Sequence, residues 1–152
     1  MAAAALDLTS VPDALLAVFL VGTLASLSWY DLRERIIPNR IVLPTWVCVL
    51  TFQLVFHTGR WTEWLAASAI ATLAFLIPAL AYPPAIGMGD VKLAGLIGAA
   101  LGYGVLTGLL VGTVLAGVFA ALLLIFRGSS ARRQTLPYGP FLAGGAVIVL
   151  LL

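Results

Sequence analysis

Charged residues are scarce in this chain. They make up 9% of its 152 residues, whereas hydrophobic residues make up 62%. A soluble domain has roughly 25% charged residues, so these few charges cannot coat a soluble globule. The scarcity excludes an ordinary soluble domain and predicts a membrane protein whose main surroundings are the lipid bilayer. A net charge of only +2 gives no reason to expect nucleic-acid binding.

Cysteine and histidine are almost absent, with one residue of each. Cys48 therefore has no second cysteine for an intrachain disulfide, and it completes no Cys/His cluster that could hold a metal ion. Because Cys48 lies within an apolar run, we expect it to be a small buried hydrophobic residue. No metal and no cofactor are predicted.

Long apolar runs are what the sequence has in place of charge, and its mean hydropathy is +1.14. Turn signals separate them, and Trp61 and Trp64 follow one such turn as expected anchors at the membrane interface. The pattern predicts an all-α, polytopic membrane protein, with about six transmembrane helices in one bundle and a single domain over residues 1–152. The expected spans are residues 14–30, 41–57, 64–82, 90–101, 105–126 and 138–152.

The basic residues favour one orientation, because cytoplasmic loops retain Lys and Arg. If residues 31–40 face the cytoplasm, then residues 83–92 and 127–138 do so too. Seven of the eight basic residues then lie on that side and only Arg60 on the other. This predicts a multi-pass membrane protein with both termini outside. No basic segment marks residues 1–13 as a cleavable signal peptide, so the first span is expected to be retained.

Two acids stand out because they lie at the edges of apolar runs. Asp31 follows the first run, Asp90 begins the fourth, and we expect no third acid in a comparable setting. An acid in such a place must be solvated, paired with another group or part of a functional site. The predicted topology puts both aspartates on the cytoplasmic side. We therefore predict that the two carboxyl groups meet.

Such a pair has a known chemistry, because two neighbouring carboxyl groups cannot both be fully ionised. The charged one can take a proton from a bridging water while the protonated one polarises a peptide carbonyl. This is how an aspartic protease works, and it needs no metal. Gly87 and Gly89, just before Asp90, would allow unusual backbone angles and close approach of a substrate.

Each of these residues also has a simpler interpretation. Asp31 could be a solvated helix end among arginines, and Asp90 could be a helix cap. Lys92 is either an interface lysine or a charge that tunes the pair. Arg33 is either an orientation signal or a partner for Glu34 or lipid phosphates.

Three motifs together resemble the type IV prepilin peptidases, bacterial members of the intramembrane GxGD aspartyl proteases. They occur in order and cover essentially the whole chain. They are Asp31-x-Arg33 followed by Ile37-Pro38-Asn39, then Gly87-x-Gly89-Asp90-Val91-Lys92, and lastly Leu136-Pro137-Tyr138-Gly139-Pro140-Phe141-Leu142.

The resemblance implies an aspartic endopeptidase that removes the short leader of type IV pilin-like precursors at the cytoplasmic membrane face. It makes Asp31 and Asp90 the catalytic pair, with an active-site loop of Gly87, Gly89 and Lys92. Residues that it implies as structural or substrate support are Arg33, Glu34, Pro38, Asn39, Pro137, Tyr138, Gly139 and Pro140.

One departure from the family concerns N-methylation of the new pilin terminus. Many members carry a cytoplasmic domain with paired cysteines that is linked to this activity. Residues 31–40 are too few for such a domain and Cys48 is the only cysteine, so we do not expect methyltransferase activity. This minimal form resembles the peptidases of tight-adherence (Flp) pilus systems.

Two other functions stay open at this point. In a proton-coupled transporter component, Asp31 and Asp90 would relay protons, although the spans offer little polar lining beyond scattered Ser and Thr. A non-catalytic subunit of a pilus or secretion assembly would function without either acid. Leader removal by Asp31→Ala or Asp90→Ala variants distinguishes these functions from a protease. Nothing in the sequence indicates an oligomeric state.

Overall fold

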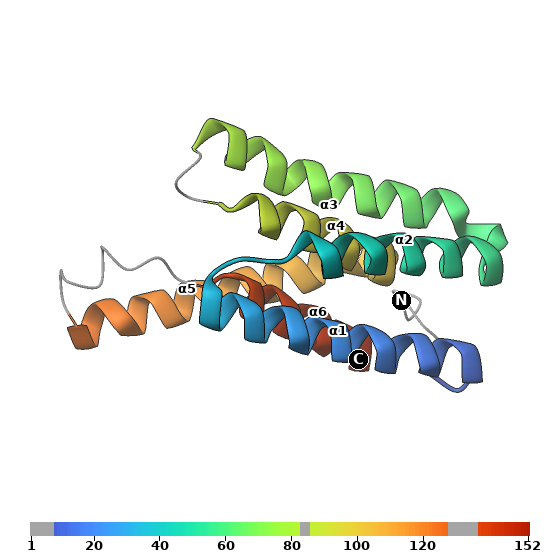
Figure 1. Ribbon diagram of the computed structural model, residues 1–152, viewed down its shortest axis with the longest axis horizontal. Helices are drawn as coiled ribbons and strands as arrows, with labels where there is room; N and C mark the ends of the chain where they lie inside the picture. Colours follow the sequence, from blue (N-terminus) through green and yellow to red (C-terminus); the bar gives the residue numbers. More distant parts are fainter. Residues whose placement is uncertain (1–7, 83–85, 128–136) are drawn as a thin grey trace.

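The computed structural model of the chain describes residues 8–82, 86–127 and 137–152. These residues form six α-helices, two short 3-10 turns and no strand, so the all-α prediction is confirmed. Figure 1 shows the helices lying along one common direction. They are α1 (Val11–Glu34), α2 (Asn39–Phe56), α3 (Trp61–Ala81), α4 (Met88–Leu101), α5 (Val105–Arg127) and α6 (Gly139–Leu151).

Four segments of the described residues are long and apolar enough to be candidate membrane spans. The fourth joins α4 and α5 through the turn η2 (Gly102–Gly104). Helix α6 has 13 residues and is about 20 Å long, shorter than the roughly 30 Å hydrocarbon core. A count of six spans stays a prediction. The four segments are Val11–Glu34, Asn39–Phe56, Thr58–Ala81 and Met88–Arg127.

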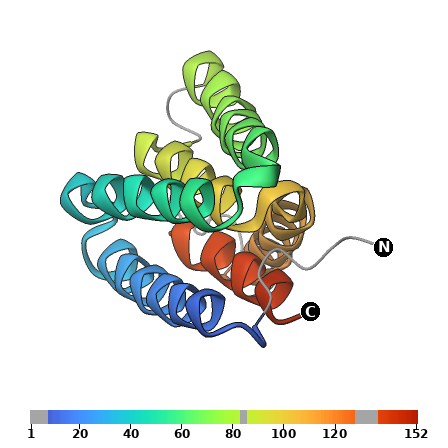
Figure 2. The same cartoon turned by 90° about the vertical axis from the view of Figure 1, so that its right-hand side faces the viewer.

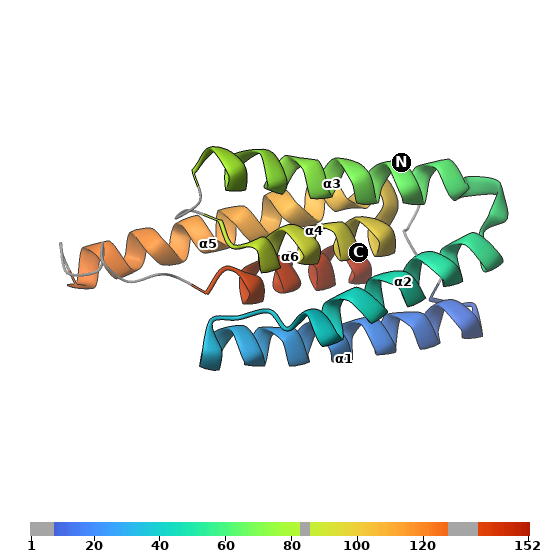
Figure 3. The same cartoon turned by 45° about the horizontal axis from the view of Figure 1, so that its top comes forward.

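Successive helices run in opposite directions (Figures 1 and 3). We call the end at which α1, α3 and α5 stop, and α2, α4 and α6 begin, the aspartate end. Among the basic residues that the structure describes, only Arg60, which precedes α3, lies at the opposite end. Those at the aspartate end are Arg33, Arg35, Arg40, Lys92 and Arg127.

Helix α4 is the most enclosed helix, and ten of its 14 residues are buried. It packs mainly against α3 and α2 and also contacts α6 and α5 (Figure 2). Glycines permit this close approach: a Cβ added at Gly98 would lie 2.6 Å from the carbonyl oxygen of Ala67 in α3, and one at Gly95 would lie 2.5 Å from the Trp46 ring of α2. Small residues bring membrane helices together in this way.

Side-chain hydrogen bonds also hold α4 in place. The Ser68 hydroxyl of α3 donates to the carbonyl of Gly95 at 2.9 Å and accepts from Nε1 of Trp46 at 2.9 Å. Nε2 of Gln53, in α2, donates to the carbonyl of Ala100 at 3.2 Å. Helices α2, α3 and α4 therefore form one hydrogen-bonded unit.

Helix α1 is longer than the expected span of residues 14–30. It continues through Asp31 to Glu34 and ends where Arg35 adopts a left-handed conformation (φ 53°), with its N–H donating to the carbonyl of Asp31. Leu32, Arg33 and Glu34 are good helix formers, so the helix has no reason to stop at the charged residues. Asp31 thus lies in the last turn of α1 rather than after it.

Other side-chain expectations are wrong. Cys48 is exposed on α2 rather than buried, and Trp64 is fully buried rather than at the interface. Asp13 is a third acid in an apolar setting: it is buried, and one of its oxygens lies 3.5 Å from Nε2 of His57. Residues 83–85, and most of the residues 127–138 that are expected on the cytoplasmic side, lie outside the described residues.

Close packing at Gly98 gives a prediction for stability. Gly98→Ala should lower the free energy of unfolding by about 1–3 kcal/mol, because the new methyl group meets backbone atoms that cannot move aside. Unfolding of the purified protein in mixed micelles by a rising fraction of SDS, followed by circular dichroism, measures this change.

The matched control is Gly117→Ala in α5, where an added Cβ has no heavy atom within 4 Å. It should be neutral or stabilising by up to about 1 kcal/mol, since alanine is the better helix former. Equal destabilisation by both variants would contradict the packing described for α4.

Candidate active site

Asp31 is held by the start of α6. Its carboxyl group is buried, and its Oδ2 accepts a 2.9 Å hydrogen bond from the backbone N–H of Gly139. Gly139 is the first residue of α6, where backbone N–H groups have no partner within the helix and attract an anion. A Cβ at Gly139 would lie 2.8 Å from that same oxygen, so a side chain here would push the Asp31 carboxyl group aside.

Asp90 is the third residue of α4, and Gly87 caps the start of this helix. A Cβ at Gly89 would lie 2.8 Å from Cβ of Ile37. The absence of a side chain at Gly89 therefore lets the segment after α1 pack over the beginning of α4. Two motifs that are far apart in the sequence meet at this contact.

Asp31 and Asp90 line the same cavity, which has a volume of about 210 Å³. Asp31 from α1 and Asp90 from α4 thus reach one common space, where two ionised carboxylates would repel each other. A water molecule takes roughly 30 Å³ of liquid, so this cavity has room for several waters or a peptide group beside the acids. The lining residues are Asp31, Arg35, Ile36, Ile37, Gly87, Met88, Gly89 and Asp90.

Lys92 and Asn39 lie beside this cavity but do not line it. Nζ of Lys92 donates to Oδ1 of Asn39 at 2.7 Å, which ties the start of α4 to the start of α2. Pro38 caps α2, and its carbonyl accepts from the N–H groups of the third and fourth residues that follow it. These contacts fix the start of α2 against the start of α4, the helix that carries Asp90.

The segment 137–140 turns the chain into α6. The Tyr138 hydroxyl donates to Oγ1 of Thr113 at 2.8 Å, and its ring lies 6.1 Å from that of Phe75. Pro137 precedes this tyrosine, and Pro140 occupies the first turn of α6, where a missing N–H costs nothing. Together they aim the N–H of Gly139 at Asp31.

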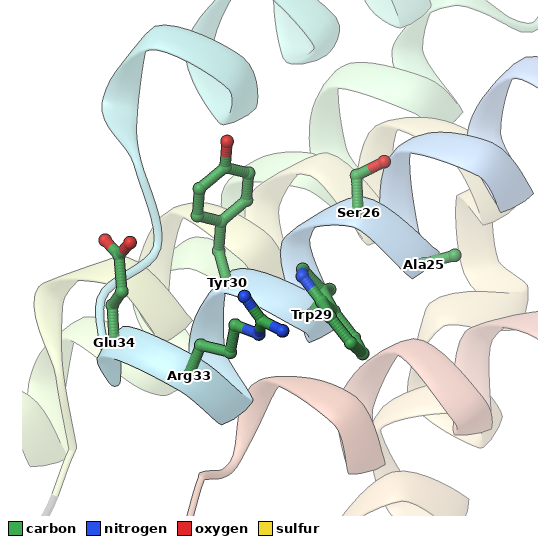
Figure 4. A pocket seen from close by; sticks show the side chains of 6 residues that line it. All are labelled: Ala25, Ser26, Trp29, Tyr30, Arg33 and Glu34. Carbon is green, nitrogen blue, oxygen red and sulfur yellow. The ribbon is translucent and has the colours of Figure 1, made fainter.

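Arg33 and Glu34 do not line the cavity that Asp31 and Asp90 share. The Arg33 guanidinium lies over the Trp29 ring, with its central carbon 4.4 Å from the ring centroid. Both residues line a separate cavity on α1, shown in Figure 4.

Sequence reasoning missed the specific role of Gly139 and the contribution of Arg35, Ile36 and Met88 to the cavity. The only sequence signal for these four residues is that they lie in or beside the three motifs. Within the three described ranges, no group of three or more His, Cys, Asp or Glu side chains gathers where it could hold a metal ion.

Comparison with known proteins points to one family. The model of the type IV leader peptidase family matches residues 18–126. No solved structure matches the chain significantly.

Three similar relatives are each named prepilin leader peptidase/N-methyltransferase. The one from Bacillus subtilis (strain 168) is 28% identical over 135 residues, covering 89% of this chain and 54% of that protein. The one from Burkholderia pseudomallei (strain 1026b) is 33% identical over 159 residues, with coverages of 99% and 50%. The one from Aeromonas hydrophila is 29% identical over 145 residues, with coverages of 90% and 49%. The chain thus spans about half the length of the curated relatives it matches.

The shared cavity predicts that cysteines in place of Asp31 and Asp90 can be joined by a short bifunctional thiol reagent. We expect this cross-link in membranes from an Asp31→Cys/Asp90→Cys variant that also carries Cys48→Ser. Intact-protein mass spectrometry distinguishes one bridging reagent from two singly attached ones.

The control pair is Arg60→Cys with Asp90→Cys, because these positions lie at opposite ends of the bundle. It should be labelled at both cysteines without forming a bridge. If the Asp31/Asp90 pair is also labelled twice and never bridged, the two side chains do not share a cavity.

Proposed function

Because the chain belongs to the type IV leader peptidase family, we propose that it is an aspartic endopeptidase that removes the leader peptide of type IV pilin-like precursors. Asp31 and Asp90 are the catalytic pair. The observation that carries this proposal is that two acids from distant helices line one cavity at the aspartate end. Like charges are costly in an apolar setting, and their grouping marks a functional site.

The proposed reaction begins with one aspartate ionised and the other protonated. The ionised carboxylate takes a proton from a water molecule, whose oxygen attacks the scissile carbonyl carbon while the protonated aspartate donates to the carbonyl oxygen. In the second step the C–N bond breaks, and the proton taken from water passes to the leaving amine. The carbonyl oxygen returns its proton, which restores the pair.

The surrounding residues assist this chemistry by position. The N–H of Gly139 orients Asp31, and the exposed Gly87 lets an extended substrate backbone approach Asp90 without meeting a side chain. Gly89 and Ile37 hold the two acid-bearing segments together. The contact between Lys92 and Asn39 holds the start of α4 against the start of α2, so both are positioning residues for Asp90.

We propose that residues 1–152 form one transmembrane domain in the bacterial plasma membrane, with all six helices embedded. The aspartate end faces the cytoplasm and both termini lie outside. The basic residues at the aspartate end support this orientation, because positive charge is retained in the cytoplasm. The short α4 and α6 reach the membrane surface only at sites where the bilayer thins or water enters.

The relatives' printed name includes a second activity, N-methylation, and their chains are about twice as long. That activity is not part of the proposal, and its absence from this chain stays a prediction. A role in a tight-adherence pilus system likewise stays a prediction.

Replacing either aspartate should abolish cleavage. With Asp31→Asn or Asp90→Asn, we expect leader removal to slow by about a thousandfold or more. The two acids act as one catalytic unit, so the loss of either costs nearly as much as the loss of both. The measurement is the initial rate of cleavage of a coexpressed pilin precursor in isolated membranes, with the new terminus identified by sequencing.

Asp13→Asn is the control, since Asp13 is also a buried acid but lies at the opposite end. It should leave the cleavage rate within a few-fold of the unmodified protein. Cleavage that survives both Asp31→Asn and Asp90→Asn would leave a transporter component or a non-catalytic assembly subunit as the better proposal.

Gly139→Ala should lower kcat by about tenfold to a hundredfold with little change in KM, because the methyl group displaces the Asp31 carboxyl group by a fraction of an ångström or more. The control is Gly144→Ala in the same helix, where an added Cβ has no heavy atom within 4 Å. A fall in kcat of the same size in both variants would show that α6 as a whole, and not the Gly139 contact, matters for activity.

A further inference from the structure

A second cavity, of about 560 Å³, lies on the last three turns of α1 and shares no lining residue with the aspartate cavity. All six lining residues are exposed, so the cavity is an open groove on the outer face of α1. Asp31 lies on the same turns but faces the interior of the bundle. The lining residues are Ala25, Ser26, Trp29, Tyr30, Arg33 and Glu34.

The lining combines two exposed aromatic rings with one positive and one negative side chain. Trp29 is 57% and Tyr30 39% exposed, and the Arg33 guanidinium is held over the Trp29 ring at 4.4 Å. In Figure 4 the Tyr30 ring stands between the Trp29 ring and the Glu34 carboxylate, and Ala25 and Ser26 leave the neighbouring turn open. A ligand for this cavity should carry both charges and an apolar portion.

The depth of the cavity identifies the class of ligand. Helix α1 has 24 residues and is about 36 Å long, against roughly 30 Å for the hydrocarbon core. Its last turns therefore emerge among the lipid headgroups, where Trp and Tyr side chains gather. Ser26 lies about 10 Å deeper than Arg33 along the helix, so the cavity reaches from the phosphate level to the start of the acyl chains.

We propose that this cavity binds a phospholipid whose headgroup carries an ammonium group, such as phosphatidylethanolamine. The phosphate binds Arg33, and the ammonium group binds Glu34 and the face of the Tyr30 ring. The small residues Ala25 and Ser26 leave room for the glycerol portion. An anionic headgroup without an amine, such as phosphatidylglycerol, would leave Glu34 beside a negative ligand. The bound lipid would anchor the end of α1 that carries Asp31.

Lipid binding is measured without any substrate, so its test does not depend on the proposed peptidase activity. The purified full chain in detergent is titrated with phosphatidylethanolamine or phosphatidylglycerol of the same acyl chains, and bound lipid is counted by native mass spectrometry. We expect half-saturation at about tenfold lower phosphatidylethanolamine than phosphatidylglycerol, as one additional charge-assisted contact predicts.

Variants of the two charged residues separate the parts of the site. Arg33→Gln should raise the half-saturating concentration of both lipids about tenfold, since both lose the phosphate contact. Glu34→Gln should weaken only phosphatidylethanolamine and so remove the preference. Arg40→Gln removes an exposed positive charge at the same end without touching the cavity, and should bind both lipids like the unmodified chain.

Equal binding of the two lipids by the unmodified chain would overturn the ammonium assignment. Binding by Arg33→Gln equal to that of the unmodified chain would overturn the site itself. Glu34→Gln is an exposed, isosteric change, and it alone decides the assignment if Arg33→Gln does not fold.

Discussion

Ser68 joins three helices through one hydroxyl group, donating to Gly95 of α4 and accepting from Trp46 of α2. Inside a membrane the hydrophobic effect does not draw helices together, because lipid tails are as apolar as the side chains. Close packing and hydrogen bonds must do so. The glycines of α4 allow α3 to come near enough for the Ser68 contact, and that contact in turn fixes the height of α4 in the bundle. Asp90 lies in the first turn of α4, so its position depends on this unit.

Asp31 depends on a different set of contacts. Helix α1 packs mainly against α6, and α6 packs tightly against α5. A Cβ on Gly145 of α6 would collide with the carbonyl of Gly108 and the backbone of Gly112 in α5. Asp31 is thus placed by α1 together with α5 and α6, and Asp90 by α4 together with α2 and α3. The two sets meet where Ile37 contacts Gly89. The spacing of the aspartates is sensitive to this contact and to the hydrogen bond by which Gly139 holds Asp31.

The sequence predicted the helical class, the approximate spans and the residues around the cavity, because charges and glycines stand out in an apolar chain. It could not predict which way each helix faces. Lipid and protein interior are both apolar, so the hydrophobic pattern of a membrane helix gives little sign of its buried side. This is why Cys48 and Trp64 were assigned to the wrong surroundings. The hydrogen bond from Gly139 to Asp31 joins residues 108 positions apart, and no local sequence pattern predicts such a contact.

Asp13 shows what an acid in this bundle does when its role is structural. It is buried at the opposite end from the cavity, and it faces His57, a residue that can carry the opposite charge. Burial of an acid is tolerated when such a partner is present. Asp31 instead shares its cavity with another acid, Asp90, and two ionised carboxylates there would repel each other. A fold that needed only stability would keep like charges apart, since the repulsion weakens the bundle where they meet. The different treatment of these acids in one small protein is the physical reason to assign chemistry to the Asp31/Asp90 pair and stability to Asp13.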